Sequence, residues 1–146
     1  PNIITSLELD PAEMEKRNIH LQKKYAEIEE NEVRFEELHC EDSEYLIVAF
    51  GSCARIAQKA MEMAREEGIK VGLLRPITLW PFPSKAIAAR AAQVKGILTV
   101  ELNAGQMVDV RLAVKCKVPV EHFGRLGGIV PDPDEVITAL KEKLIK

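Results

Sequence analysis

The sequence has few cysteines, and no two of them are close together. Cysteine occurs at three of 146 positions, Cys40, Cys53 and Cys116, with no C-x-x-C pair among them. An odd number of widely spaced cysteines argues against a disulfide framework and predicts reduced thiols, as in the cytoplasm. The same spacing argues against zinc or an iron–sulfur cluster held by this chain alone.

Long apolar runs and clusters of basic residues are also missing. No apolar stretch approaches the ~18 residues that a membrane-spanning helix needs, and the first residues lack the basic-then-apolar order of a signal peptide. We therefore expect a cytoplasmic protein with no membrane partner. The 20 basic residues are scattered and the net charge is −3, which disfavours nucleic acid as a partner. The opening Pro1-Asn2, in place of Met, predicts a fragment of a longer polypeptide.

Motifs that carry chemistry are absent as well. The sequence contains no G-x-S-x-G, no Walker A motif and no thiamine-type G-D-G. Its three histidines, His20, His39 and His122, lie in different predicted elements and lack metal-ligand spacing. The sequence therefore predicts no metal site and no complete catalytic apparatus in this domain.

Residues 1–43 are predicted to form a helical arm followed by an edge strand. Residues 11–32 are polar and helix-favouring, and Asp10-Pro11 is a suitable N-cap and N1 pair. The apolar residues of this helix form one stripe, which consists of Met14, Leu21, Tyr25 and Ile28. A stripe this narrow cannot build a core, so we expect the helix to lie across another surface of this domain or of a partner. Residues 33–39 alternate as an edge strand does.

Residues 44–146 alternate between short apolar runs and segments with helical spacing. Strands are expected at residues 46–50, 71–74, 97–100 and 118–120. Helices are expected from the Gly51-Ser52 turn to Gly68, from an N-cap at Ser84, around residues 107–115, and after a capping box that starts at Asp132. This alternation predicts a single α/β domain with a doubly wound, mostly parallel sheet, preceded by the long N-terminal helical arm.

Three loops follow the carboxyl ends of predicted strands, where doubly wound sheets bind ligands. In the first, the backbone amides of Gly51 and Ser52 open a helix and are candidates for holding an anion. A dinucleotide fingerprint needs three glycines, however, and only one is present. Cys53 is either a reactive thiol with a lowered pKa or a small buried residue.

The second loop, PITLWPFP at residues 76–83, is stiffened by three prolines and carries the only tryptophan. A rigid loop with several large apolar side chains suits an interface, because little entropy is lost on docking. The alternative is a long connection that packs on its own domain.

The third loop lies in the stretch VELNAGQ. Here Glu101, Asn103 and Gln106 supply polar groups, and Gly105 allows a positive φ. No second acid, nucleophile or histidine is expected nearby, so the loop suits recognition of a shape better than acid–base catalysis. The alternative is a turn whose polar groups satisfy one another.

These loops also carry a family resemblance. The ordered series EYLIVAFGSCARIAQKAM, GIKVGLLRPITLWPFP, VELNAGQMVDV and GRLGG followed by PDPDEV resembles the C-terminal domain of the α subunit of 2-oxoacid:ferredoxin oxidoreductases. The resemblance covers residues 44–146, and the preceding helix with residues 33–39 resembles the linker arm of that subunit.

The resemblance implies a fold like the C-terminal domain of transketolase, within an enzyme that oxidatively decarboxylates a 2-oxo acid. Such a complex uses coenzyme A, thiamine diphosphate, Mg²⁺ and iron–sulfur clusters, and passes electrons to ferredoxin. The partners implied are a β subunit and further subunits in an oligomer. None of these cofactors is expected on this domain alone, which should be inactive by itself. The RPITLWPFP loop is most similar to the 2-oxoisovalerate type, with the 2-oxoglutarate type next.

The resemblance gives this domain a role in assembly, with no catalytic residue assigned. The residues expected at an interface or at the rim of the active site are Arg75, Leu79, Trp80, Pro81, Phe82, Pro83, Glu101, Asn103 and Gln106. Two alternatives remain open at this point. One is a stand-alone module that binds a nucleotide or coenzyme A at Gly51 and Ser52. The other is a domain of another thiamine-dependent enzyme, such as transketolase or a branched-chain dehydrogenase β chain.

Overall fold

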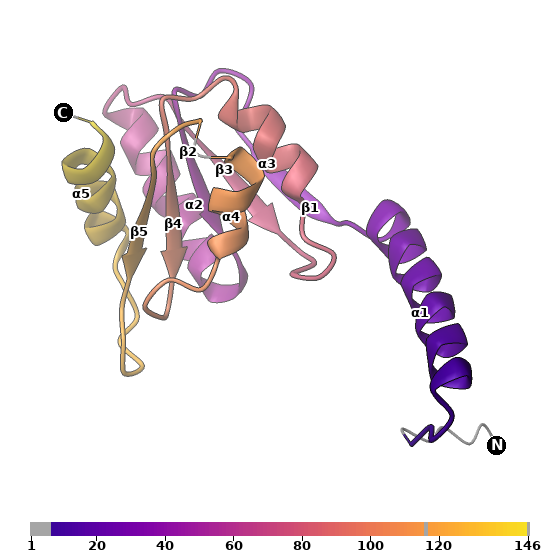
Figure 1. The fold of residues 1–146 in the computed structure, drawn as a ribbon. Coiled ribbons are helices and arrows are strands. Elements are labelled where there is room, and N and C mark those ends of the chain that lie inside the picture. Colours follow the sequence, from indigo (N-terminus) through magenta and orange to yellow (C-terminus); the bar gives the residue numbers. More distant parts are fainter. Residues whose placement is uncertain (1–6, 116, 146) are drawn as a thin grey trace.

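The computed structural model describes residues 7–115 and 117–145, so Pro1 and Cys116 lie outside the described residues. The helices are α1 (Pro11–Asn31), α2 (Gly51–Glu66), α3 (Ser84–Ala91), α4 (Val108–Val114) and α5 (Pro133–Leu144). The strands are β1 (Phe35–Leu38), β2 (Tyr45–Ala49), β3 (Val71–Pro76), β4 (Gly96–Glu101) and β5 (Val120–Gly124). Figure 1 shows one sheet between helices, with α1 extending away from it.

The sheet has the strand order β1-β3-β2-β4-β5. Strands β3, β2, β4 and β5 are mutually parallel, and β1 pairs antiparallel with β3 at one edge. This arrangement confirms the predicted mostly parallel, doubly wound sheet. It also makes β1 part of the same sheet as the residues that follow it, while the division of the chain after residue 43 stays a prediction.

Helices cover both faces of the sheet, which explains why its central strands are apolar throughout. Side chains alternate along β2. Ile47 and Ala49 pack with α2 and α5, whereas Leu46 and Val48 pack with α3 and α4. A strand that is polar on one side would leave one of these layers without a core.

Most boundaries lie within two residues of those expected, and three differences stand out. The last strand is β5 rather than residues 118–120, because pairing with β4 begins at Val120, and Pro119 contributes only its carbonyl, to Ile97 N at 2.9 Å. The N-cap of α3 is Pro83 rather than Ser84, which is already helical. The expected turn at Gly51 is the first residue of α2, with φ of +57°. The capping box of α5 is confirmed at Asp132 and Glu135, and the Glu135 carboxylate accepts from Asp132 N at 3.0 Å.

Helix α1 confirms the predicted arm, and none of its residues is buried. Two contacts tie it to the sheet domain. The rings of Tyr25 and Trp80 meet edge to face with centroids 5.7 Å apart, and Lys85 Nζ lies 3.1 Å from a Glu30 carboxylate oxygen. Among the described residues, nothing buries the apolar stripe of α1: Met14, Leu21 and Ile28 are half-buried, and Tyr25 is exposed. Within the described ranges, no helix is both long enough and apolar enough to cross a membrane.

The edge strand β1 is fixed to the domain by an ion pair that reaches across to α3. Arg90 donates to both carboxylate oxygens of Glu37, from Nε at 2.9 Å and from an Nη at 2.6 Å. Both side chains are only about one-fifth exposed. These hydrogen bonds, opposed in part by desolvation, hold the pKa of Glu37 below its ordinary value and raise the pKa of Arg90.

The Glu37–Arg90 pair predicts acid sensitivity of the fold. Because the folded pKa of Glu37 is depressed, its contribution is present above the unfolded pKa near 4.5 and is lost as pH falls through the lower folded value. We expect Glu37→Gln to lower the free energy of unfolding by about 2 kcal/mol at pH 7 and by less as the pH falls below 4. Urea titrations across this range measure the difference, and an equal cost at every pH would contradict it.

Candidate functional site at the switch point of the sheet

The order of strands reverses between β2 and β4. The chain leaves β2 for β3 on one side and then returns to β4 on the other side of β2. In doubly wound sheets such a switch point opens a crevice at the carboxyl ends of the two strands. Here those ends lead into Gly51, at the start of α2, and into the loop at residues 101–107. Two of the three loops singled out in the sequence therefore flank one position in the fold.

The side chain of Glu101 lies inside its loop. Glu101 is 2% exposed, although it carries a carboxylate. The backbone N–H of Met107 donates to its two oxygens at 3.0 and 3.2 Å, and that of Gln106 at 3.2 and 3.3 Å. The side-chain amide of Asn103 donates a further bond at 3.0 Å. The carboxylate thus closes the loop on itself and presents no oxygen to a partner.

Asn103 and His122 complete this closure. The side-chain oxygen of Asn103 accepts from the backbone N–H of Gly105 at 2.7 Å and of Gln106 at 3.1 Å. The carbonyl of Asn103 accepts from His122 Nε2 at 3.1 Å. In the neutral imidazole, Nδ1 then accepts from the Thr99 hydroxyl 3.0 Å away. His122 Nδ1 is also 3.7 Å from a Glu101 oxygen.

The expectation that no histidine lies near this loop was wrong. Strands β4 and β5 are parallel neighbours, and their register sets His122 opposite Thr99 and Gly124 opposite Glu101. Because side chains alternate along a strand, Thr99 and Glu101 share a face with His122. The alternation of side chains along each strand is visible in the sequence. Placing His122 beside Thr99, however, also requires knowing that β4 pairs with β5, and these two residues are 23 positions apart.

The exposed crest of the loop consists of Leu102, Ala104, Gly105 and Gln106. Of the residues expected at an interface here, Gln106 is exposed, Asn103 is half-buried and Glu101 is buried. The interior of the loop is therefore the self-satisfied turn that the sequence left as an alternative, and the crest is an apolar and amide surface. Such a loop offers a fixed shape rather than a free acid or base.

The start of α2 shows a helix end without a side-chain cap. Phe50 is its N-cap and makes no side-chain hydrogen bond, and both Gly51 and Ser52 are exposed. Cys53 is only 4% exposed. Burial raises the pKa of the Cys53 thiol, and the nearby charge of Glu101 raises it further. Cys53 is therefore the small buried residue rather than the reactive thiol.

The buried thiols predict slow alkylation. Cys40 is 1% exposed and burial raises its pKa to about 11, so neither Cys40 nor Cys53 presents a thiolate at neutral pH. We expect iodoacetamide at pH 7.5 to modify both sites at least tenfold more slowly in the folded chain than in urea. Peptide mass spectrometry resolves each site, and rapid modification of Cys53 in the folded chain would contradict this assignment.

The second loop, residues 76–83, is held by hydrogen bonds to Arg34, in the segment between α1 and β1. The Thr78 hydroxyl accepts from Arg34 N at 3.0 Å and donates to the Pro81 carbonyl at 2.8 Å. The Trp80-Pro81 peptide is cis. Leu79 and Trp80 are about half exposed, whereas Pro81 and Pro83 are buried and Phe82 is half-buried.

Arg75, another residue expected at an interface or rim, lies beside this loop on β3. Its guanidinium donates to Glu36, the residue opposite it on β1, at 2.9 Å. Both side chains are about half exposed. Arg75 therefore takes part in a surface ion pair that links the edge strand β1 to its neighbour β3.

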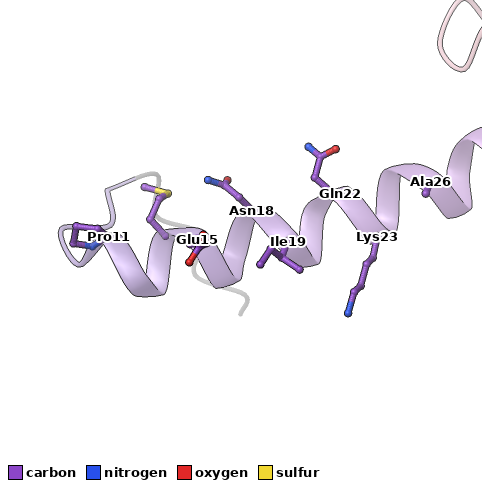
Figure 2. Close-up of a pocket in the computed structure, with 8 residues that line it drawn as sticks. Pro11, Glu15, Asn18, Ile19, Gln22, Lys23 and Ala26 are labelled. Atoms are coloured by element: carbon purple, nitrogen blue, oxygen red, sulfur yellow. The ribbon is translucent and has the colours of Figure 1, made fainter.

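A shallow hollow runs along one side of α1. Figure 2 shows its lining residues, which mix polar side chains such as Asn18 and Gln22 with Ile19 and Ala26. All of them come from the single helix, so no second element encloses a ligand there. The described residues also bring together no three histidine, cysteine, aspartate or glutamate side chains that could hold a metal ion.

Comparison with known proteins finds a family model that matches most of the chain. Residues 43–136 match the pyruvate:ferredoxin oxidoreductase core domain II. Over 142 residues, 97% of this chain, the sequence is 47% identical to the ketoisovalerate oxidoreductase subunit VorB of Methanothermobacter thermautotrophicus. It is 34% identical over 101 residues, 68% of this chain, to the 2-oxoglutarate synthase subunit KorA of the same organism. The chain spans 40% of the first relative and 27% of the second.

Two solved structures share the fold. The 2-oxoglutarate:ferredoxin oxidoreductase from Magnetococcus marinus, with 2-oxoglutarate, coenzyme A and succinyl-CoA bound, superposes with a TM-score of 0.75 at 22% identity, over 92% of this chain and 24% of that one. A split-gene transketolase, an inactive β4 tetramer, superposes with a TM-score of 0.64 at 20% identity, over 77% of this chain and 41% of that one. Both likenesses confirm the expected transketolase-like architecture.

Proposed function

The chain belongs to the pyruvate:ferredoxin oxidoreductase core domain II family, and from that premise we propose that it serves as the assembly domain of a 2-oxoacid:ferredoxin oxidoreductase α subunit. The whole enzyme would oxidatively decarboxylate a 2-oxo acid to its acyl-CoA and pass the electrons to ferredoxin. In this proposal, the chain contributes shape and contact surface to that reaction and no catalytic residue.

The observation that carries the proposal is the closed loop after β4. Its carboxylate is 2% exposed and accepts from two backbone amides and from Asn103, which places Glu101 to hold the loop rather than to take a proton from a substrate. A rigid crest at the switch point remains, and a second polypeptide can pack against it. Its exposed members, Leu102 and Gln106, offer one apolar group and one amide for that contact.

The substrate class follows from sequence likeness. The greater identity lies with the ketoisovalerate oxidoreductase subunit, at 47%, compared with 34% for the 2-oxoglutarate synthase subunit. We therefore propose a branched-chain 2-oxo acid such as 2-oxoisovalerate. A 2-oxoglutarate enzyme is the closest alternative.

Cofactors and partners are assigned to other parts of the complex. The described residues bring together no cluster of three or more metal-ligating side chains, and we propose that the Mg²⁺ that accompanies thiamine diphosphate is held elsewhere in the complex. We propose that thiamine diphosphate and the iron–sulfur clusters are held by a β subunit and by further domains of an oligomer. The free thiols of Cys40 and Cys53 support a cytoplasmic location.

Reconstitution tests this proposal. The chain is produced joined to the thiamine domain of the VorB relative and together with the matching β and smaller subunits, and the purified complex is assayed for reduction of methyl viologen. We expect reduction that depends on coenzyme A and is fastest with 2-oxoisovalerate, whereas the chain alone gives none. Absence of turnover with every 2-oxo acid, in a complex that does assemble, would contradict the proposal. Micromolar binding of coenzyme A by the chain alone would instead favour a ligand-binding module.

A further inference from the structure

The exposed aromatic side chains of the described residues all lie at one junction. Tyr25, Phe35 and Trp80 are each between 39% and 54% exposed. They come from the end of α1, from β1 and from the 76–83 loop, where Tyr25 and Trp80 touch. Leu79, at 48% exposed, extends the same apolar surface. Large exposed aromatic patches mark interaction sites, because isolated apolar side chains are common on surfaces but contiguous ones are not.

This surface is hollowed into a groove. The groove has a volume of about 710 Å³ and lies between the end of α1, the start of β1 and the loop. Val33 and Phe35 line it from the β1 side, and residues 79–83 line it from the loop side. A smaller adjoining hollow is lined by Gln22, Tyr25, Glu29 and Trp80, so Glu29 and Trp80 border both.

The walls of the groove are fixed before anything binds. The backbone N–H groups of Ile77 and Thr78 both donate to the Arg34 carbonyl, at 2.9 and 3.1 Å. The Thr78 hydroxyl adds its bonds to Arg34 and Pro81. Because these bonds join the loop to the segment after α1, the two walls keep their spacing and lose little entropy on docking.

The charges around the groove indicate which kind of partner residue it would bind. The last turn of α1 has no basic residue, and the partial negative charge of a helix C-terminus disfavours the carboxylates that stand there. Lys85 pairs with Glu30, but Glu29 has no ion pair with any described residue. A cation beside Glu29 would gain from that carboxylate, from the helix end and from the adjacent rings of Tyr25 and Trp80.

We propose that this groove binds a segment of a partner polypeptide that carries a large apolar side chain next to an arginine or lysine. The apolar side chain fills the groove beside Phe35 and Leu79, and the basic group lies between Glu29 and Trp80. This inference rests on the assembly role proposed above and names one surface and one partner chemistry for it.

The single tryptophan of the chain makes the test direct, because Trp80 fluorescence reports on the groove itself. The probes are three short synthetic peptides without tryptophan or tyrosine: Leu-Phe between two arginines, Leu-Phe between two glutamates, and Ser-Ser between two arginines. We expect only the first to shift Trp80 emission saturably. Glu29→Gln should weaken its binding about threefold, and Leu79→Ala about fivefold.

Matched variants separate the groove from the rest of the surface. Leu126→Ala removes an exposed leucine from the loop after β5, and Glu36→Gln removes an exposed carboxylate from β1; both should leave the affinity unchanged. Failure of the first peptide to bind, or binding that ignores Glu29→Gln and Leu79→Ala, would overturn the inference. So would a dimer in light scattering that Leu79→Ala dissociates, since the occupant would then be a second copy. These measurements use the chain alone, so a negative result leaves the reconstitution assay to decide the enzyme's function.

Discussion

Replacing Glu101 with glutamine lowers the free energy of unfolding by about 3 kcal/mol, because a buried carboxylate with several donors becomes a neutral amide with one acceptor. The size of the effect follows from the contacts. Gln106 N, Met107 N and the Asn103 side chain all donate to a group that is 2% exposed. In the glutamine variant one of these donors faces the side-chain NH₂ instead. Urea titration of the isolated chain measures the change.

A matched control for Glu101→Gln is Glu36→Gln. Glu36 is also a carboxylate that accepts a hydrogen bond, here from Arg75 at 2.9 Å, but both of these side chains are about half exposed. Its replacement should cost less than about 1 kcal/mol. If the two variants lose the same stability, the loop is not held together by the buried carboxylate.

Replacing Gly124 with alanine is expected to cost about 3 kcal/mol, at the upper end for an overpacked site. A Cβ at this position would collide with the Asn103 carbonyl oxygen and lie 2.5 Å from His122 Nε2. The first of these atoms belongs to the backbone of the closed loop, so the strain cannot be relieved by rotating a side chain. We expect the variant to lose the His122–Asn103 hydrogen bond, which the chemical shifts of the imidazole report.

Gly96→Ala is the matched control for Gly124→Ala, because Gly96 is also a strand glycine with a close neighbour. Its Cβ would meet Leu144 Cδ2 at 2.8 Å, which is the far end of a flexible side chain. A loss of less than about 1 kcal/mol is expected there, since Leu144 can rotate away. If thermal unfolding shows that the two variants lose equal stability, then crowding at any strand glycine, rather than the closed loop, determines the loss.

Most of the fold could be predicted from the sequence because its signals are local. Continuous apolar runs such as Leu46–Phe50 indicate strands covered on both faces, and the Asp132 capping box fixes the start of α5. The strand order was not readable, because it depends on which strands pair across long connections. The start of β5 was also misplaced. Val118 and Pro119 look strand-like, but Pro119 has no N–H to give to β4.

The candidate site could be predicted less well than the fold. The loop after β4 was recognised as important from its residue types, and its polar residues were expected at an interface or an active-site rim, with a self-satisfied turn as the alternative. The structure turns Glu101 inward because the backbone amides that follow need an acceptor, and Asn103 supplies the second one. His122 was missed because its place beside Thr99 depends on the β4–β5 pairing.

Several charged side chains of this chain are engaged in contacts within the fold. Glu101 closes a loop, Arg75 links two strands and Arg90 ties α3 to β1. Each of these charged side chains holds two parts of the backbone together. The surfaces left over are the loop crest and the aromatic groove, which are suited to contact.

The central claim, that this chain supplies contact and not chemistry, is tested most directly by Gln106→Ala in the reconstituted enzyme. Gln106 is the exposed amide on the crest of the loop, and Gln58→Ala, an exposed amide on α2, is its control. Sedimentation measures how much complex forms, and viologen reduction measures kcat for each complex formed. We predict assembly weakened about fivefold with kcat unchanged within about twofold. Normal assembly with kcat lowered by about a hundredfold would contradict the claim, because a loss of that size marks a group that acts in the transition state.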